Sequence, residues 1–442
     1  MESVSEAEPE TARGSLTVPQ GTALYIGAVL GTGIIALPAL AAQAAGPASL
    51  LAWLGLVLLS TLLAATFAAL GARYPDAGGV STYVRSAFGS RAAAVVGWCF
   101  YFAIPLGAPP AAGFAGAYVA DAVGGGRNTQ LVTCAVLIAI VAAMNFVGIR
   151  VSGSVQLVIA GCLAVLLALA TLVSLPHADL DNLTPFAPFG WGAVGSAAAL
   201  LVWAFAGWEA VSSLSGDYRN PRRDIPRATA VAVLLIGVLY LGVAFATVAV
   251  LGDHAGPAPL SDLLVLGFGP AARPLTTLMA VLLSLGAMNA YFAGSARLGA
   301  ALGRDGSLPE WFAHGSAAGS VPRRSLVAVT ALSLGTLLAI GLTDLPLEST
   351  LLLTTGAFTL VYVVGTAAAI RLLPRSTWVW RCAVVSNVST LALLWMTGVH
   401  LAAALGIAAT ALVWSFGRRG RVSSSSAVVS GAEQATGLGD TP

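Results

Sequence analysis

Apolar stretches long enough to form membrane helices, about 20 residues each, recur along almost the whole chain, separated by short polar connections. A helix of that length crosses the ~30 Å hydrocarbon core of a bilayer. The pattern predicts twelve spanning helices, the last two of which share barely enough length for a pair. The predicted spans are 18–44, 48–72, 93–120, 129–147, 153–175, 192–215, 229–251, 272–296, 324–342, 348–370, 380–397 and 400–417.

The first predicted span contains a run that a lipid-embedded helix tolerates poorly. The segment "GAVLGTGIIALPAL", residues 27–40, places Gly31, Thr32 and Gly33 near its middle. Non-helical backbone at membrane depth has polar groups that lipid cannot satisfy, so it occurs only against protein or a wet cavity. The alternative is that these glycines let neighbouring helices pack closely, in a chain that has 50 glycines.

The sixth span has a second candidate break. Its sequence "LLVWAFAGWEAVSSLSGDY", residues 200–218, has Gly207 near the middle. Because the second break lies five spans after the first, an odd number, spans one and six run in opposite directions. Paired breaks of this kind are typical of inverted repeats that build a binding site at the membrane midplane. Spans one to five and six to ten do not align convincingly, so the matched breaks carry the prediction.

The two breaks predict a site for a ligand with both a carboxylate and an ammonium group. An interrupted helix exposes free amides at one new end and free carbonyls at the other. We expect the amides around Gly31 and Gly33 and the hydroxyl of Thr32 to receive a carboxylate. The carbonyls of Val29, Trp203 and Ala206 are the candidates for an ammonium. The glycines permit the unusual dihedral angles and the close approach that such binding needs.

Glu209 is the acidic residue that falls inside a predicted span. Burying an ionisable group in the membrane is costly, which favours a functional role in proton coupling or gating. The structural alternative is a neutral carboxylic acid that bonds a neighbouring helix. Its position two residues after Gly207 favours the functional interpretation.

The residues around the breaks favour a ligand with a neutral, apolar side chain. The predicted zone offers Trp203, Phe205, Trp208 and aliphatic residues, whereas cationic ligands generally need several carboxylates or an aromatic cage. Each tryptophan alone is as readily explained by packing. Asn289, inside span eight, faces the cavity or bonds another helix, and the sequence does not distinguish these roles.

Three prolines of span three, in "FAIPLGAPPAAG", predict a kink with freed carbonyls, either in a cavity wall or as a purely structural feature.

Composition and charge place the chain in the membrane. It has 442 residues, of which 57% are hydrophobic and 9% are charged, whereas soluble domains have about 25% charged residues. Every basic residue is an arginine. With a cytoplasmic N-terminus, all arginines except Arg127 and Arg273 lie on cytoplasmic segments or span edges, as the positive-inside rule requires. The net charge of +2 gives no indication of nucleic-acid binding. Arginine clusters such as Arg222 and Arg223 set topology, with contact to anionic lipid as the lesser alternative.

The remaining segments predict no further chemistry. Residues 1–17 form a polar cytoplasmic tail without the apolar core of a signal peptide, and residues 418–442 have a disordered composition. The four cysteines lie in or beside apolar spans and are expected to be buried thiols. The histidines do not group, and no phosphate loop or catalytic motif occurs. The chain therefore predicts no cofactor, no metal site and no enzymatic activity.

The motifs together resemble the amino acid–polyamine–organocation superfamily. The resemblance rests on "GAVLGTGIIALPAL", "RYPDAGGVSTYVRSAFGS" (73–90), "FAGWEAVSSLSGDYRNPRRDIPRA" (205–228) and "GSARLGAALGRDGSLPEWFA" (294–313). These segments cover the first ten spans. "PLGAPPAAG" in span three and the span-six segment look closest to bacterial exporters of methionine and branched-chain amino acids.

The resemblance implies an all-α polytopic fold with a five-plus-five inverted-repeat (LeuT-like) core and discontinuous helices one and six. It also implies alternating access, and recognition of an amino-acid backbone at Val29, Thr32, Gly33, Trp203, Ala206 and Gly207. Glu209 matches a glutamate linked to gating or protonation. Some relatives place a lysine in span five in place of a sodium ion, but this chain has no lysine. Coupling to sodium or to protons therefore stays open.

The resulting expectation is a transporter of small neutral amino acids in the bacterial inner or plasma membrane, with both termini cytoplasmic. Residues 18–370 form the ten-helix core and residues 371–417 two additional helices. Proton-coupled export is the favoured mode; import or exchange, efflux of unrelated amines or drugs, and a non-transporting membrane enzyme or sensor are the alternatives. Exact substrate, stoichiometry and oligomeric state are not predicted.

Overall fold

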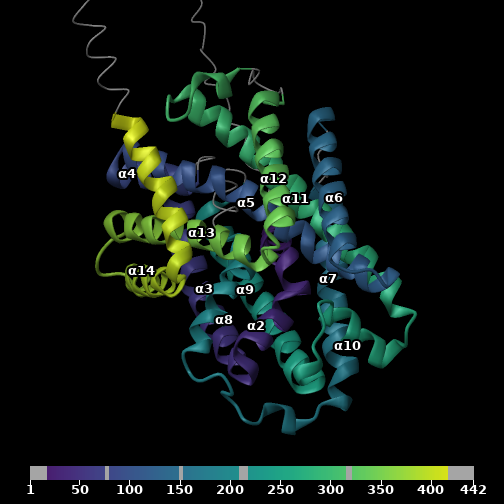
Figure 1. Ribbon diagram of the computed structural model, residues 1–442. Helices are drawn as coiled ribbons and strands as arrows, with labels where there is room; N and C mark the ends of the chain where they lie inside the picture. Colours follow the sequence, from purple (N-terminus) through teal and green to yellow (C-terminus); the bar gives the residue numbers. More distant parts are fainter. Residues whose placement is uncertain (1–16, 75–78, 149–152, 209–217, 315–320, 417–442) are drawn as a thin grey trace, which may run out of the picture.

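The computed structural model describes residues 17–74, 79–148, 153–208, 218–314 and 321–416, which are nearly all helical and contain no β-strand (Figure 1). Its α-helices are α1 (Val18–Val29), α2 (Leu37–Ala45), α3 (Ser49–Arg73), α4 (Val80–Phe88), α5 (Ser90–Val123), α6 (Arg127–Val147), α7 (Gly153–Ser174), α8 (Ala193–Phe205), α9 (Pro221–Ala246), α10 (Pro259–Phe268), α11 (Ala272–Arg304), α12 (Arg323–Thr343), α13 (Leu347–Leu372) and α14 (Trp378–Met396). A final helical segment covers Gly398–Phe416.

Nine helical segments among the described residues are long and apolar enough to cross a membrane. Shorter apolar helical stretches lie at Gly161–His177, which includes the end of α7, at Ala193–Phe205 and at Pro259–Phe268. The chain is therefore a helical membrane protein, as its sequence predicts. Two of the expected spans, 18–44 and 192–215, are shorter as helices because each leaves helical geometry near its middle, so the total of twelve stays a prediction.

Small residues hold the long helices close together. A Cβ at Gly97 of α5 would lie 2.7 Å from a methyl carbon of Leu302 on α11, and a Cβ at Gly237 of α9 would lie 2.9 Å from Val57 on α3. Real side chains do not approach this closely, so glycine sets these helix separations. Close packing of this kind is the main source of helix association in lipid, where no hydrophobic effect drives helices together.

The prolines of span three do not interrupt their helix. Pro105, Pro109 and Pro110 all lie inside the 34-residue helix α5. Side chains from other helices bond carbonyls along the same stretch: Ser284 donates to the Ala111 carbonyl at 3.0 Å. Bonds from neighbouring helices are one way in which membrane helices accommodate proline. Helix α5 consequently runs unbroken along one side of both helix breaks.

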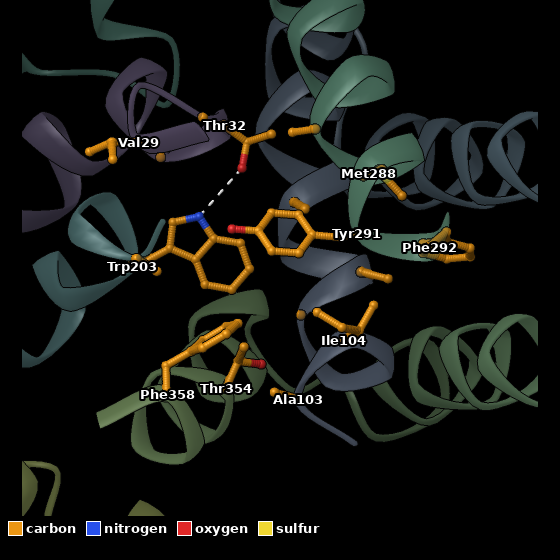
Figure 2. A pocket seen from close by; sticks show the side chains of 17 residues that line it. Val29, Thr32, Ala103, Ile104, Trp203, Met288, Tyr291, Phe292, Thr354 and Phe358 are labelled. Atoms are coloured by element: carbon orange, nitrogen blue, oxygen red, sulfur yellow. Dashed lines mark hydrogen bonds between the residues drawn. The ribbon is translucent and has the colours of Figure 1, made fainter. Parts of the chain in front are cut away.

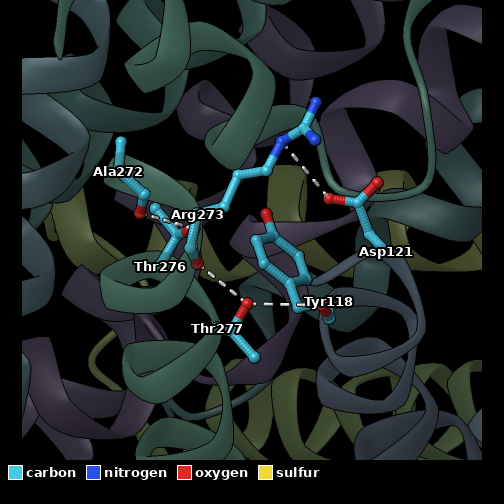
Figure 3. Close-up of polar contacts among 6 residues, drawn as sticks. All are labelled: Tyr118, Asp121, Ala272, Arg273, Thr276 and Thr277. Carbon is cyan, nitrogen blue, oxygen red and sulfur yellow. Dashed lines mark hydrogen bonds and ion pairs between the residues drawn. The ribbon is translucent and has the colours of Figure 1, made fainter. Parts of the chain in front are cut away.

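The two arginines expected on the opposite side from the others both have acidic neighbours. Arg127 lies 3.8 Å from Asp344, and Arg273 lies 4.0 Å from Asp121. The Arg273 pair joins the end of α5 to the start of α11 (Figure 3). Such half-exposed pairs contribute at most about 1 kcal/mol each.

Candidate binding site

The first break lies between α1 and α2. Helix α1 ends at Val29, and Gly31 has φ −23° and ψ −158°, outside helical geometry. A short 3₁₀ turn, Thr32–Ile35, then leads into α2. Because the first turn of a new helix has no intrahelical acceptors for its amides, the amides of Thr32 and Gly33 are available for an anionic group.

The second break follows α8. The helix ends at Phe205, and Ala206 has extended dihedral angles of φ −69° and ψ 136°. Gly207 follows with φ +133°, a conformation that residues with a side chain rarely adopt. Glu209, the expected proton-coupling residue, lies outside the described residues.

Gly33 brings the two breaks into direct contact. A Cβ at position 33 would lie 2.8 Å from Cδ1 of Trp203 and 3.3 Å from the Cα of Ala204. The indole nitrogen of Trp203 donates to the hydroxyl of Thr32 at 3.4 Å, as Figure 2 shows. A larger residue at position 33 would push the Trp203 ring away from Thr32.

A narrow pocket of about 50 Å³ lies at this junction (Figure 2). Val29, Gly31, Thr32 and Gly33 line it from the first break, and Trp203 and Ala206 line it from the second. Ala103, Ile104, Gly107, Ala108 and Ala111 of α5 form one wall. The remaining wall comes from Ala287, Met288, Tyr291 and Phe292 of α11 and from Thr354 and Phe358 of α13.

The pocket wall is apolar and carries few polar groups. Of the described residues that line it, none has a carboxylate, an ammonium or a guanidinium group. The side-chain polar atoms belong to Thr32, Trp203, Tyr291 and Thr354, and the Thr354 hydroxyl already donates to the Thr350 carbonyl at 2.8 Å. A charged ligand would therefore rely on the backbone groups of the two breaks, while its apolar part would contact the wall.

Tyrosine hydroxyls satisfy the carbonyls that the breaks expose. The single hydroxyl proton of Tyr240 on α9 is shared between the carbonyls of Val29, at 2.7 Å, and Ala204, at 2.9 Å. Tyr362 of α13 donates to the Phe205 carbonyl at 3.4 Å. The Val29 carbonyl, expected to bind an ammonium, thus already has one partner.

Tyr118 of α5 does the same at the far side of the first break. Its hydroxyl donates to the Ile35 carbonyl at 2.6 Å and accepts from the amide of Leu260 at 3.2 Å. Thr277 of α11 donates to the backbone carbonyl of Tyr118 at 3.3 Å, beside the ion pair of Asp121 and Arg273 (Figure 3). The ion pair and the first break are therefore connected through Thr277 and Tyr118, because Thr277 also bonds the Arg273 carbonyl.

Phe114 contacts Trp203 of the pocket wall but does not itself line the pocket. Its ring packs edge-on against Trp203, with 6.0 Å between the ring centroids. Beyond Phe114 lies a second cavity of about 180 Å³, whose polar lining includes Gln43, Gln130 and Glu348. The aromatic pair thus lies between the pocket and this cavity.

Three of the expected site residues do not line the pocket. Phe205 packs between Trp53 and Tyr240, with ring centroids 6.0 and 5.2 Å away. Gly207 is part of the second break but is absent from the lining. Asn289 accepts a hydrogen bond from the side-chain amide of Asn145 at 2.8 Å, which joins α11 to α6. Of the two roles expected for Asn289, facing the cavity or bonding another helix, the structure shows the second.

The sequence analysis missed the tyrosines and most of the pocket wall. Tyr118, Tyr240 and Tyr291 each lie in an otherwise apolar span, and a buried tyrosine hydroxyl generally needs a hydrogen-bond partner. The need for a hydrogen-bond partner was the feature of the sequence that could have identified these tyrosines. No group of three or more metal-ligating side chains occurs in the described part of the chain.

Comparison with known proteins gives a consistent result. Residues 16–430 match the family model described as amino acid permease. The chain is 34% identical to YecA of Bacillus subtilis (strain 168), named an uncharacterized amino acid permease, over 88% of this chain and 93% of the relative. It is also 34% identical to YjeH of Escherichia coli (strain K12), named an L-methionine/branched-chain amino acid exporter, over 81% of this chain and 86% of the relative. It is 28% identical to BcaP of Bacillus subtilis, named a branched-chain amino acid permease, over 65% of this chain and 66% of the relative.

Proposed function

The chain belongs to the amino acid permease family, and on that premise we propose that it is a secondary active transporter of small neutral amino acids with apolar side chains. The observation that carries the proposal is the pocket at the two breaks. Its free amides suit a carboxylate, and its wall of Ile104, Met288 and Phe358 suits an aliphatic or thioether side chain. The name of the exporter relative, methionine and branched-chain amino acids, agrees with this chemistry.

The geometry of the two breaks supports one binding mode for such a substrate. The substrate carboxylate lies at the amides of Thr32 and Gly33 with the Thr32 hydroxyl as a further donor. Its ammonium lies toward the Ala206 carbonyl of the second break, because Tyr240 already bonds the carbonyls of Val29 and Ala204. Tyr362 bonds that of Phe205. The side chain extends between α5 and α11. A pocket of about 50 Å³ has room for only about four water molecules, so substrate entry requires Trp203 and the neighbouring wall to move.

The proposed mechanism is alternating access in a five-plus-five inverted-repeat core, driven by protons and directed outward. Glu209 follows the second break closely in sequence and is the proposed proton-coupling residue. The termini and the arginine-rich loops lie in the cytoplasm in this proposal, as the arginine distribution favours. Import or exchange is the alternative, because the relatives include a permease whose name states no export.

The test is flux of labelled methionine, leucine and alanine through proteoliposomes of the purified protein, with an imposed pH gradient in either direction. We expect gradient-dependent methionine and leucine flux, with Glu209→Gln abolishing the gradient dependence and Glu310→Gln, an exposed control, leaving it unchanged. Net flux against the proton gradient identifies antiport, and flux with it identifies symport. Absence of flux for every neutral amino acid, with correctly inserted protein, contradicts the proposal and favours amine or drug efflux.

A further inference from the structure

A long apolar groove lies on the lipid-facing side of the bundle, between α3, α9 and the start of α14. Its volume is about 610 Å³, and it is separate from the pocket at the breaks. Leu234 and Val238 of α9 and Trp378 of α14, which line it, are 70%, 61% and 66% exposed. The described part of the chain therefore leaves this groove open.

The two long helices of the groove, α3 and α9, run antiparallel along it. Val57 and Gly237 meet near one end, where a Cβ at position 237 would lie 2.9 Å from Val57. From there the lining continues at helical spacing to Ala69 on α3 and Pro226 on α9. Twelve residues of helix cover about 18 Å, close to the ~15 Å hydrocarbon depth of one membrane leaflet. The length of the groove thus fits one acyl chain.

Arginines lie just beyond the apolar part of the groove, on both α3 and α9. Arg73 follows Ala69 by four residues, and Arg222 and Arg223 precede Pro226 by four and three, so each lies one turn further along the lining face. All three are exposed, and none forms an ion pair with another described residue.

The antiparallel register brings the arginines of the two helices to the same membrane level. Arg73 lies sixteen residues from Val57, and Arg222 lies fifteen residues from Gly237. The amino-terminal end of α9 adds the partial positive charge of its free amides. The first-turn carboxylate of this helix, Asp224, already accepts a bond from the Asn220 amide at 3.2 Å.

We propose that this groove binds one anionic phospholipid, with an acyl chain along α3 and α9 and the phosphate between Arg73 and Arg222 and Arg223. The apolar length and the cationic end match the two parts of such a lipid. A second copy of the chain is a poorer occupant, because a two-fold contact across the groove would bring the same arginines together. The inference does not depend on which substrate the protein transports.

Native mass spectrometry of the purified full chain tests this, by titration with phosphatidylglycerol and, separately, with phosphatidylcholine of the same acyl chains. The variant Arg73→Gln/Arg222→Gln/Arg223→Gln removes the cationic end. The control Arg297→Gln/Arg323→Gln/Arg324→Gln removes the same charge from α11 and α12, which pack on α5 and α6. We expect the first phosphatidylglycerol to bind at least about tenfold more weakly to the groove variant, with the control and phosphatidylcholine binding unchanged.

A second pair of variants tests the apolar part without altering charge. Ala65→Leu fills the groove, whereas Ala331→Leu enlarges an exposed position of α12. We expect only Ala65→Leu to reduce phosphatidylglycerol retention. Equal affinity for the two lipids, or equal effects of the groove and control variants, overturns the proposal in favour of general lipid contact. A dimer that Ala65→Leu abolishes overturns it in favour of a second copy of the chain.

Discussion

The hydroxyl of Tyr240 donates a hydrogen bond to the backbone carbonyl of Val29, with 2.7 Å between the two oxygens. Val29 is the last residue of α1 before the first break, and Tyr240 lies on α9, 211 positions later in the chain. The same hydroxyl lies 2.9 Å from the Ala204 carbonyl of α8. One buried side chain therefore links the carbonyl ends of both interrupted helices.

Tyr240→Phe removes this link and retains the ring. Because two buried carbonyls then lose their donor, we expect the free energy of unfolding to fall by about 1–3 kcal/mol. We also expect amino-acid flux to fall more than stability accounts for, since the break geometry relaxes. Thermal unfolding and proteoliposome flux measure the two effects. Tyr74→Phe, on a half-buried tyrosine at the end of α3, is the control. Equal effects of the two variants would contradict the special role of Tyr240.

Gly33→Ala tests the contact between the two breaks. Its Cβ would meet Trp203 and Leu37, each at 2.8 Å, so the Trp203 ring must shift away from Thr32. We expect the apparent KM for methionine to rise at least about tenfold, the cost of losing one or two well-placed hydrogen bonds. Gly55→Ala on α3 is the matched control, because nothing lies within 4 Å of its added Cβ. An unchanged KM in Gly33→Ala would exclude the proposed carboxylate position.

The sequence predicts the helical membrane fold and the positions of both interruptions. The interruptions are predictable because glycines recur near the middle of spans one and six, two spans that run in opposite directions. It does not predict the partners of the interrupted backbone. The Tyr240 bond joins segments that are far apart in the chain, and no periodicity within either helix indicates which neighbour supplies the donor.

Side-chain directions near a break are equally hard to predict. Phe205 and Ala206 are adjacent, yet only Ala206 lines the pocket, because the helix ends between them and its regular rotation of successive residues stops. Asn289 is polar and central in its span, which suits a binding role and a helix-joining role alike. Its partner, Asn145, lies on a different helix, and only the packing of α6 against α11 distinguishes the two roles.

Asn289→Ala separates these roles by experiment. The Asn145–Asn289 bond lies away from the pocket, so we expect a loss of stability of about 1–2 kcal/mol with little change in KM for any amino acid. The double variant Asn145→Ala/Asn289→Ala completes the cycle, and the second change should cost less than it does alone. Thermal unfolding and flux kinetics are the measurements. A large KM change with normal stability would place Asn289 in the binding site instead.

The pH dependence of stability has a specific contributor at Asp262 of α10. Burial raises the pKa of this carboxyl, repulsion from Asp121 raises it further, and Arg273 partly opposes both. Since the pKa is higher in the folded state than the ordinary value of about 4, the folded state retains its proton over a wider range. Stability from this group is therefore greatest below about pH 4 and falls as the pH rises through the folded-state pKa.

Asp262→Asn removes that ionisation. We expect the variant to unfold at a higher temperature than the wild type at pH 7 and at a similar temperature near pH 4. Asp253→Asn, on the turn Gly252–His254, is the control that removes one carboxylate outside α10, and a change of the same size in this control would contradict a specific role of Asp262. A variant that is less stable than the wild type at pH 7 would show that the Asp262 carboxylate makes a favourable interaction that outweighs its burial.

Gly107 of α5 provides a test of substrate size. A Cβ at this position would lie 3.0 Å from Thr354 and 3.0 Å from the Trp203 ring, so alanine narrows the pocket from its α5 wall. If the substrate side chain extends along α5, Gly107→Ala should reduce kcat/KM for methionine and leucine by about 10-fold or more, because a one-carbon change in an apolar pocket is worth about 1–3 kcal/mol. Transport of the smaller substrate alanine should change little in this variant. Gly286→Ala on α11, where nothing lies within 4 Å of the added Cβ, should leave the ratio unchanged. A uniform loss for all three substrates would instead mean that the substitution alters the Trp203 position, and the proposed direction of the side chain would be wrong.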